Sequence, residues 1–132
     1  MVLKEKVCVV TGGGSGIGRS AAISMAMAGA QLVLIGRTLS KVDEVRVEIE
    51  KLGGVAESIL LDVGNNESVQ NTMTTVLEKY GRVDVLVNNA GHSSIHRTLS
   101  STTPEELQSV LESNLSGTIY CSQAVVPNMI KR

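Results

Sequence analysis

The feature that most constrains this sequence is a glycine-rich turn between an apolar run and a run of small residues. Residues 7–10 are apolar, residues 11–18 comprise Thr11 and a cluster of glycines, and residues 20–26 are mostly small. A strand, a glycine turn and a helix in this order bring the first N–H groups of the helix to the turn, where they attract an anion. Glycines let the backbone approach that anion closely. The segment therefore predicts a strand–turn–helix unit able to hold a pyrophosphate.

The spacing of the glycines is Gly12-x-x-x-Gly16-x-Gly18, with Ile17 between the last two. It differs from the common dinucleotide pattern G-x-G-x-x-G. Glycine-rich turns also serve as plain connections between a strand and a helix. The glycines alone leave both interpretations open, and the later segments have to decide between them.

Composition limits the other classes of function. The chain has 132 residues, 42% of them hydrophobic and 19% charged, which is typical of one globular domain. A net charge of −1 gives no electrostatic reason to expect nucleic acid or an anionic membrane as a partner. No apolar run approaches the roughly 18 residues of a membrane span, and a strand is expected within about five residues of Met1, which leaves no room for a signal peptide. A cytoplasmic location is the default expectation.

No metal or redox site is expected. Cys8 and Cys121 lie far apart in the sequence, without a ligand at metal spacing, and both are interpreted as buried thiols. His92 and His96 also lack a second ligand at a suitable distance. They fall in a polar segment, residues 92–102, which is expected to be a loop bordering a substrate cleft.

Apolar runs alternate with segments of helical periodicity along the whole chain. This alternation predicts an α/β fold, a doubly wound parallel sheet with helices on both faces and with the strand order 3-2-1-4. A helix start is predicted at Thr103, followed by Pro104 and by Glu106 in a capping box, and Pro127 is expected to kink this last helix. The predicted strands are residues 6–11, 31–35, 56–61 and 83–87, and the predicted helices are residues 16–28, 40–52, 68–80 and 103 to the end.

Polar or glycine-rich clusters follow all four predicted strands, and in such sheets ligands bind beyond the carboxyl ends of the strands. Each cluster also has a plain explanation. Asn88 and Asn89 are common in turns, and Asp62 often caps a helix or is solvated. The clusters are residues 12–18, Gly36 and Arg37, Asp62 and Val63, and residues 88–91.

Taken in order, these segments resemble the short-chain dehydrogenase/reductase family, and the resemblance covers the chain from Lys6 to the final helix. It implies a Rossmann-type fold and an oxidoreductase that moves a hydride between a nicotinamide cofactor and a small carbonyl or alcohol substrate. It also implies a homo-oligomeric parent protein. The segments that carry it are Thr11 with Gly12-x-x-x-Gly16-x-Gly18, Asp62-Val63, Asn88-Asn89-Ala90-Gly91 and Asn114.

The resemblance also implies roles for individual residues. In the family, an Asp-Val pair like Asp62 and Val63 contacts the adenine ring, and an Asn-Asn-Ala-Gly motif supports the sheet and lines the ribose. Asn114 matches a helix residue that holds a proton-relay water beside the catalytic Lys, although an Asn within a helix also often faces solvent and bends the backbone. The cofactor-binding residues so implied are Gly12, Ser15, Gly16, Ile17, Gly18, Arg37, Asp62, Val63, Asn89, Ala90 and Gly91.

The end of the second predicted strand predicts the cofactor. An enzyme that prefers NAD needs a carboxylate there to bind the ribose 2′-hydroxyl, whereas this chain has Gly36 followed by Arg37. A guanidinium forms charge-assisted hydrogen bonds to a 2′-phosphate. NADP(H) is therefore predicted in preference to NAD(H). Ser15 and Arg19 are candidates to assist, although Arg19 is equally well explained as a solvated helix residue.

The proton donor of the family is missing from these residues. The family uses a Tyr with a Lys four residues later, together with a Ser, but Asp84 follows Tyr80 at that spacing and Ala124 follows Tyr120. We therefore expect the N-terminal, cofactor-binding part of a longer reductase, inactive alone and poorly stable or oligomeric through the open edge of its fourth strand. A natural truncation completed by a partner is one alternative. A catalytically inactive nucleotide-binding module, acting as a sensor or an assembly subunit, is another.

Overall fold

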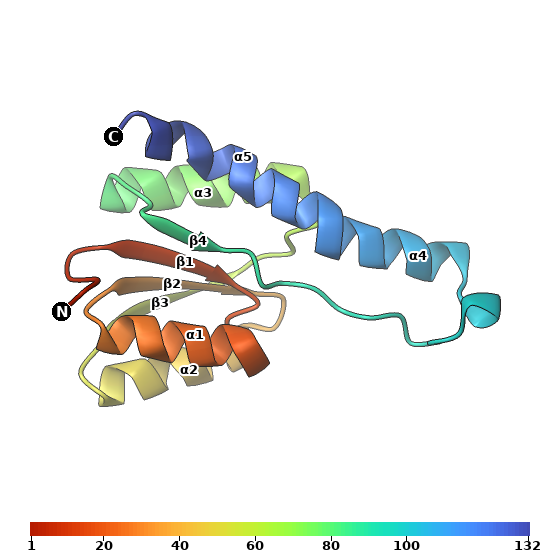
Figure 1. Cartoon of the computed structure of the whole chain (residues 1–132), viewed down its shortest axis with the longest axis horizontal. Coiled ribbons are helices and arrows are strands. Elements are labelled where there is room, and N and C mark those ends of the chain that lie inside the picture. Colours follow the sequence, from red (N-terminus) through yellow and green to blue (C-terminus); the bar gives the residue numbers. More distant parts are fainter.

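Four parallel strands form the centre of the structure, in the order β3-β2-β1-β4 (Figure 1). In this computed structural model, which describes residues 1–132, β1 is the central strand: Val9 lies opposite Val33 of β2 and Leu86 of β4. The predicted α/β class and strand order are confirmed. The strands are β1 (Val7–Thr11), β2 (Gln31–Gly36), β3 (Val55–Leu60) and β4 (Val85–Val87).

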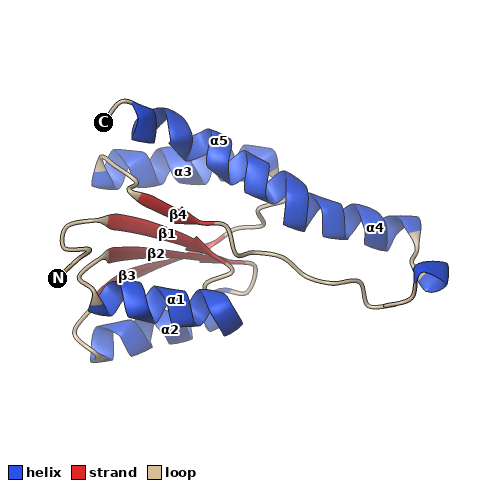
Figure 2. Cartoon of the chain, viewed as in Figure 1, coloured by secondary structure: helices blue, strands red, loops and turns tan.

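Helices cover both faces of this sheet (Figure 2). The pair α1 (Gly16–Met27) and α2 (Leu39–Lys51) covers one face, and the pair α3 (Asn66–Tyr80) and α5 (Gly117–Ile130) covers the other. A further helix, α4 (Pro104–Leu111), precedes α5 and extends beyond the sheet (Figure 1). None of the helices combines the length and the apolar character needed to cross a membrane.

The continuous apolar runs of β1 and β2 follow from this three-layer arrangement. Successive side chains of a strand point to opposite faces of the sheet, and here helices cover both faces and exclude water. Val9 and Val33 pack beneath α3 and α5, whereas Cys8 and Leu32 pack beneath α1 and α2. Both thiols are free and buried, and burial raises the pKa of Cys8 and of Cys121 to about 11.

Local signals place both ends of α3 and the start of α4. The side chain of Asn65 caps α3 by accepting a hydrogen bond from the N–H of Ser68, and Gly81 ends that helix in the left-handed conformation. The predicted capping box of Thr103 and Glu106 is present at the start of α4. The prediction began α3 two residues late, because Asn66 was assigned to the preceding loop.

The last helical region differs from a regular amphipathic helix. A π-helical segment, Glu112–Ser116, joins α4 to α5, and α5 continues past Pro127 to Ile130. The apolar residues whose spacing predicted the helix do not form its buried face. That face consists of Ser113, Gly117, Cys121 and Val125, whereas Leu107, Leu111, Leu115, Ile119 and Val126 are 40–56% exposed.

Asp84 ties the end of the last helix to the sheet. Its carboxylate accepts a 2.8 Å hydrogen bond from the N–H of Val7 and is also bound by Arg82 and by Arg132, which follows α5. Burial of this carboxyl raises its pKa, but the hydrogen bonds from Arg82, Val7 and Arg132 outweigh burial, so the pKa lies well below its ordinary value. Folding therefore favours the ionised form.

Replacing Asp84 should destabilise the fold in a pH-dependent way. We expect Asp84→Asn to lower the free energy of unfolding by about 2 kcal/mol at pH 7, because charged hydrogen bonds to a buried group are lost. Since the pKa is lowered on folding, this contribution is complete above the unfolded value of about 3.9 and is lost as the pH falls below it. Urea unfolding followed by circular dichroism at pH 7 and pH 3 measures both effects.

Asp43→Asn is the matched control, because the Asp43–Arg46 pair is partly exposed and joins adjacent turns of one helix. We expect this change to cost no more than about 0.5 kcal/mol. Equal losses in the two variants would contradict the structural role of Asp84.

Candidate functional site

The glycine turn brings the start of α1 against the end of β1. A Cβ atom at Gly18 would lie 2.2 Å from the carbonyl oxygen of Gly12 and 2.4 Å from Nδ2 of Asn89, so only glycine fits there. Gly12 and Gly16 have φ values of 64° and 55°, in the left-handed region. Ser15 does not cap α1 with its side chain, and the first turn of α1 contains no acidic residue. The N–H groups at this end are therefore available to an anion.

A buried hydroxyl joins the ends of the two neighbouring strands β1 and β4. Oγ1 of Thr11 accepts hydrogen bonds of 3.0 Å from the N–H groups of both Asn89 and Ala90, and donates to the carbonyl oxygen of Val87. The side chain of Asn89 in turn donates to the carbonyl oxygen of Gly12 at 3.0 Å. The glycine turn and the residues after β4 are thus held as one rigid edge.

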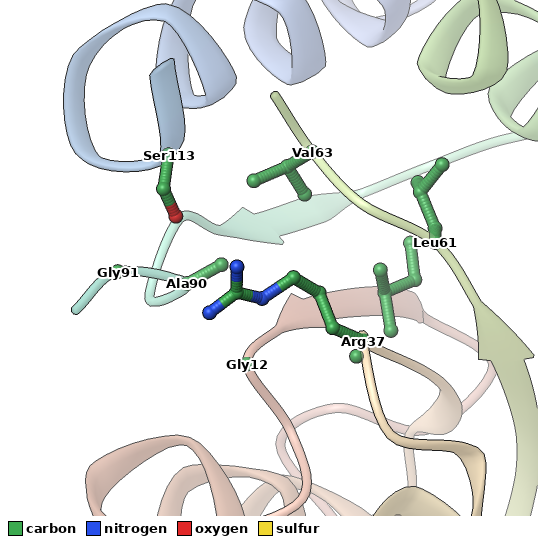
Figure 3. A pocket seen from close by; sticks show the side chains of 9 residues that line it. Gly12, Arg37, Leu61, Val63, Ala90, Gly91 and Ser113 are labelled. Carbon is green, nitrogen blue, oxygen red and sulfur yellow. The ribbon is translucent and has the colours of Figure 1, made fainter. Parts of the chain in front are cut away.

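Two cavities open along this edge. The first has a volume of about 90 Å³ and lies between the ends of β1, β2 and β4, with an apolar wall formed by Leu61, Val63 and Ala90. Figure 3 shows the guanidinium of Arg37 extended across this cavity toward Ala90. The remaining lining residues are Gly12, Ile35, Gly36, Gly91 and Ser113.

The second cavity, of about 150 Å³, lies between the glycine turn and the start of α2. Arg37 borders both cavities. No carboxylate lines either of them, and Arg37 forms no ion pair. The residues of the second cavity are Gly12, Gly14, Ser15, Gly36, Arg37, Thr38, Lys41 and Val42.

The structure brings together only some of the residues singled out from the sequence. Ile17 is 80% exposed, and the guanidinium of Arg19 is bound to Glu48 of α2 at 2.5 Å and lines neither cavity. Asp62 is exposed, and its Oδ1 atom accepts a hydrogen bond from the N–H of Gly64. Gly16 and Gly18 shape the turn. Of the predicted cofactor-binding residues, those that line the cavities are Gly12, Ser15, Arg37, Val63, Ala90 and Gly91.

Asn114 lies in the π-helical segment and holds the chain after β4 by both ends of its amide. Its Oδ1 atom accepts from the N–H of His92 at 2.9 Å, and its Nδ2 group donates to the carbonyl oxygen of His92 at 3.0 Å. A Cβ at Gly91 would lie 2.8 Å from Oδ1 of Asn114. Asn114 therefore fixes the backbone at the mouth of the first cavity. Irregular helical turns of this kind are frequent at functional sites.

The polar loop after this point is anchored to the start of α4. Nδ1 of His96 lies 2.8 Å from a carboxylate oxygen of Glu106, and the hydroxyl of Ser94 donates to the other. The imidazole of His92 pairs with Ser109. Burial raises the pKa of Glu106, but the hydrogen bonds from His96 and Ser94 outweigh it and lower the pKa. The loop contains a short 3₁₀ turn, Leu99–Ser101.

Neither tyrosine belongs to the site. Tyr80 donates a hydrogen bond to Glu57 of β3, and its pKa is raised by burial and by this bond, which is the opposite of what a proton donor at neutral pH requires. Tyr120 lies within α5. The proton donor expected for this family is therefore not supplied by either residue.

Sequence reasoning missed three polar lining residues, Thr38, Lys41 and Ser113. Ser113 lies next to Asn114 but on the buried face of the helix. The sequence did indicate Lys41 as a candidate. It follows Arg37 by four residues and lies in the first turn of a predicted helix, where a cation is unfavourable unless an anion binds nearby.

Comparison with known proteins agrees with this geometry. A family model described as short chain dehydrogenase matches residues 6–132. The chain is 36% identical over 132 residues to the 3-oxoacyl-[acyl-carrier-protein] reductase FabG of Thermotoga maritima, covering 100% of this chain and 53% of that protein. It is 36% identical over 125 residues to a 3beta-hydroxysteroid dehydrogenase of Mediterraneibacter gnavus, covering 95% and 45%. The chain thus spans about half the length of these relatives.

Solved structures give the same result for the fold. A metagenomic short-chain oxidoreductase in complex with NADP superimposes with a TM-score of 0.95 at 36% identity, covering 99% of this chain and 59% of that one. An NAD+-bound xylitol dehydrogenase superimposes with a TM-score of 0.93 at 28% identity, covering 99% and 50%. Since the two neighbours hold different cofactors, the residues of the site itself have to decide the preference.

The glycine turn predicts a specific difference between two glycine variants. Gly18→Ala places a methyl group within 2.4 Å of two neighbouring atoms, so the turn has to shift. The methyl group of Gly16→Ala meets no atom within 4 Å, and its only cost is the left-handed φ at this position. We expect Gly16→Ala to cost about 1 kcal/mol of stability and Gly18→Ala at least twice as much. Urea unfolding of both variants is the measurement. An equal cost would contradict the described packing of Gly18 on Gly12 and Asn89.

Proposed function

The chain belongs to the short-chain dehydrogenase family, and on this premise we propose that residues 1–132 form the NADP(H)-binding part of an oxidoreductase. The observation that carries the preference for NADP(H) is Arg37, an unpaired guanidinium at the end of β2 that borders both cavities, neither of which contains a carboxylate. When bound, NADPH supplies the hydride for reduction of a carbonyl, and NADP+ accepts it from an alcohol.

The glycine turn fits the pyrophosphate of such a cofactor. Gly18 lies so close to Gly12 that residue 18 has no room for a Cβ, and the start of α1 is therefore left open. The uncapped N–H groups there carry partial positive charge. A carboxylate or a larger side chain in this turn would repel or displace a pyrophosphate. We assign its binding to the backbone of residues 12–18, with Ser15 at the edge of the second cavity.

The first cavity fits the adenosine part. Val63 and Ala90 offer apolar surface to the ring and the ribose, and Asn89 holds this wall through its bond to Gly12. Asp62 stands directly before Val63, and the carboxylate oxygen not used by Gly64 is the acceptor that we assign to the adenine amine. Ile17, exposed on the first turn of α1, is assigned to the cofactor side that leads toward the nicotinamide.

Arg37 distinguishes the two nicotinamide cofactors. Its guanidinium can form charge-assisted hydrogen bonds to a 2′-phosphate, each worth about 1.5–3 kcal/mol. Position 36 lacks a carboxylate also for a reason of packing, because a Cβ at Gly36 would lie 2.9 Å from Cγ1 of Val42. The preference therefore depends on the charge of Arg37 rather than on Gly36 alone.

Asn114 is proposed as a positioning residue. By holding both backbone groups of His92, it sets the course of the chain that leaves the cofactor cavity and enters the loop of residues 92–102. That loop, with His92 and His96, is assigned to the substrate side. The substrate is proposed to be a small carbonyl compound or alcohol, and the protein a homo-oligomer. Residues 1–132 contain no Tyr-x-x-x-Lys, so we assign them cofactor binding without turnover.

Affinity for the two reduced cofactors tests this proposal. We expect the protein to bind NADPH at least about tenfold more tightly than NADH, since one charged hydrogen bond is worth that factor. Arg37→Asp should reverse the order, because a carboxylate repels the 2′-phosphate and accepts from the 2′-hydroxyl. Titration of cofactor fluorescence measures both dissociation constants.

Arg97→Asp is the control, because it makes the same change of charge at an exposed position that lines neither cavity. We expect it to leave the ratio of the two constants unchanged. Tighter binding of NADH by the unmodified protein, or an unchanged ratio in Arg37→Asp, would refute the cofactor assignment.

A further inference from the structure

We infer that Lys41 and Thr38 form the second half of the 2′-phosphate site, in the cavity between the glycine turn and α2 that they line together with Arg37. This inference rests on the proposed binding of NADP(H). Arg37 was singled out by its place at the end of β2, whereas Lys41 is brought to the site only by the packing of α2 against the glycine turn.

The stem of Lys41 lies directly against that turn. A Cβ atom at Gly14 would be 2.9 Å from Cβ of Lys41 and 3.2 Å from its backbone carbon. Lys41 therefore projects from a point in contact with the proposed pyrophosphate turn, on the side of the second cavity. A phosphate group on the adjacent ribose would lie within reach of its flexible ammonium group.

The charges around Lys41 leave its ammonium available. The carboxylates of Asp43 and Glu48 on the same helix are bound to Arg46 and Arg19, respectively. Glu44, with Asp43 and Glu48, lines a separate groove on another side of α2. Neither Lys41 nor Arg37 forms an ion pair. The second cavity thus has two free cations and no counter-charge in its lining.

The start of α2 adds to the same positive potential. Thr38 stands at its N-cap without forming a capping hydrogen bond, and the first turn carries Lys41 and no acidic residue. By contrast, α3 is capped by Asn65 and has Glu67 in its first turn. A phosphate beside Lys41 would accept hydrogen bonds from the Thr38 hydroxyl and the free N–H groups of this turn, and would compensate the cation there.

Arg37 and Lys41 should contribute differently. The guanidinium of Arg37 reaches across the first cavity toward Ala90, so it also contacts the space assigned to adenosine (Figure 3). Lys41 borders only the second cavity. Loss of the Lys41 charge should therefore weaken only ligands that carry a 2′-phosphate, whereas loss of the Arg37 side chain should also change the binding of adenosine nucleotides that lack it.

The test compares 2′,5′-ADP with 5′-AMP, two probes that differ only in the 2′-phosphate and involve no turnover. Isothermal titration calorimetry gives the dissociation constants for the unmodified protein, Lys41→Gln and Lys41→Arg. We expect Lys41→Gln to weaken 2′,5′-ADP about tenfold and to change 5′-AMP by less than about twofold. Lys41→Arg should retain most of the affinity. The salt dependence for 2′,5′-ADP should decrease in Lys41→Gln, because one cation is lost.

Lys51→Gln is the matched control, since it removes the same charge from the last turn of the same helix, away from the second cavity. Thermal unfolding confirms that each variant is folded. If Arg37→Ala weakens the binding of 2′,5′-ADP but Lys41→Gln leaves it unchanged, the role of Lys41 is overturned and that of Arg37 is not. Equal affinity of the unmodified protein for both probes would instead overturn the proposed preference for NADP(H), and this inference with it.

Discussion

The hydroxyl of Thr11 is the interaction on which the site depends. Thr11 is 2% exposed, and its hydroxyl accepts hydrogen bonds from the N–H groups of both Asn89 and Ala90. The strands β1 and β4 themselves pair through only three residues each. Without this acceptor, the N–H of Ala90 would lose its partner at the point where the strands separate, and the N–H of Asn89 would keep only its 3.1 Å bond to the carbonyl oxygen of Val87. The bond from Asn89 to Gly12 then fixes the carbonyl against which Gly18 packs. One hydroxyl thus determines where the glycine turn lies relative to the wall of the first cavity.

The sequence predicted the fold well because the signals were local or simply periodic. Both faces of β1 and β2 are covered, which produces unbroken apolar runs, and Thr103 caps the helix whose start it predicted, whereas the cap at Asn65 was not recognised. The direction of a side chain is a tertiary property and was harder to predict. Asn88 and Asn89 follow the same strand, and the family resemblance rather than the local sequence separated them: Asn89 donates to Gly12 in the glycine turn, whereas Asn88 donates to Ser122 of α5. The buried face of α5 was also missed, because small residues rather than large apolar ones pack against α3 and the sheet.

The site combines a backbone cradle with a local excess of positive charge. The chain has a net charge of −1, so its overall charge gives no sign of an anionic ligand. The cations concentrate where α2 meets the glycine turn, while neighbouring carboxylates are bound to Arg46 and Arg19. Membership of the family accounts for the glycine turn but not for this charge, since structural neighbours hold NADP in one case and NAD+ in another. The proposed preference for NADP(H) thus depends on a few side chains at the end of β2 and the start of α2.

A crystal structure of the protein with NADP+ is the most direct test of this account. It should place the pyrophosphate over the backbone of residues 12–18, the adenine between Arg37 and Val63, and the 2′-phosphate within hydrogen-bonding distance of both Arg37 and Lys41. The hydrogen bonds from Asn89 to Thr11 and to Gly12 should be retained in the complex. A nucleotide bound away from the ends of β1, β2 and β4, or a 2′-phosphate that contacts neither cation, would contradict the account.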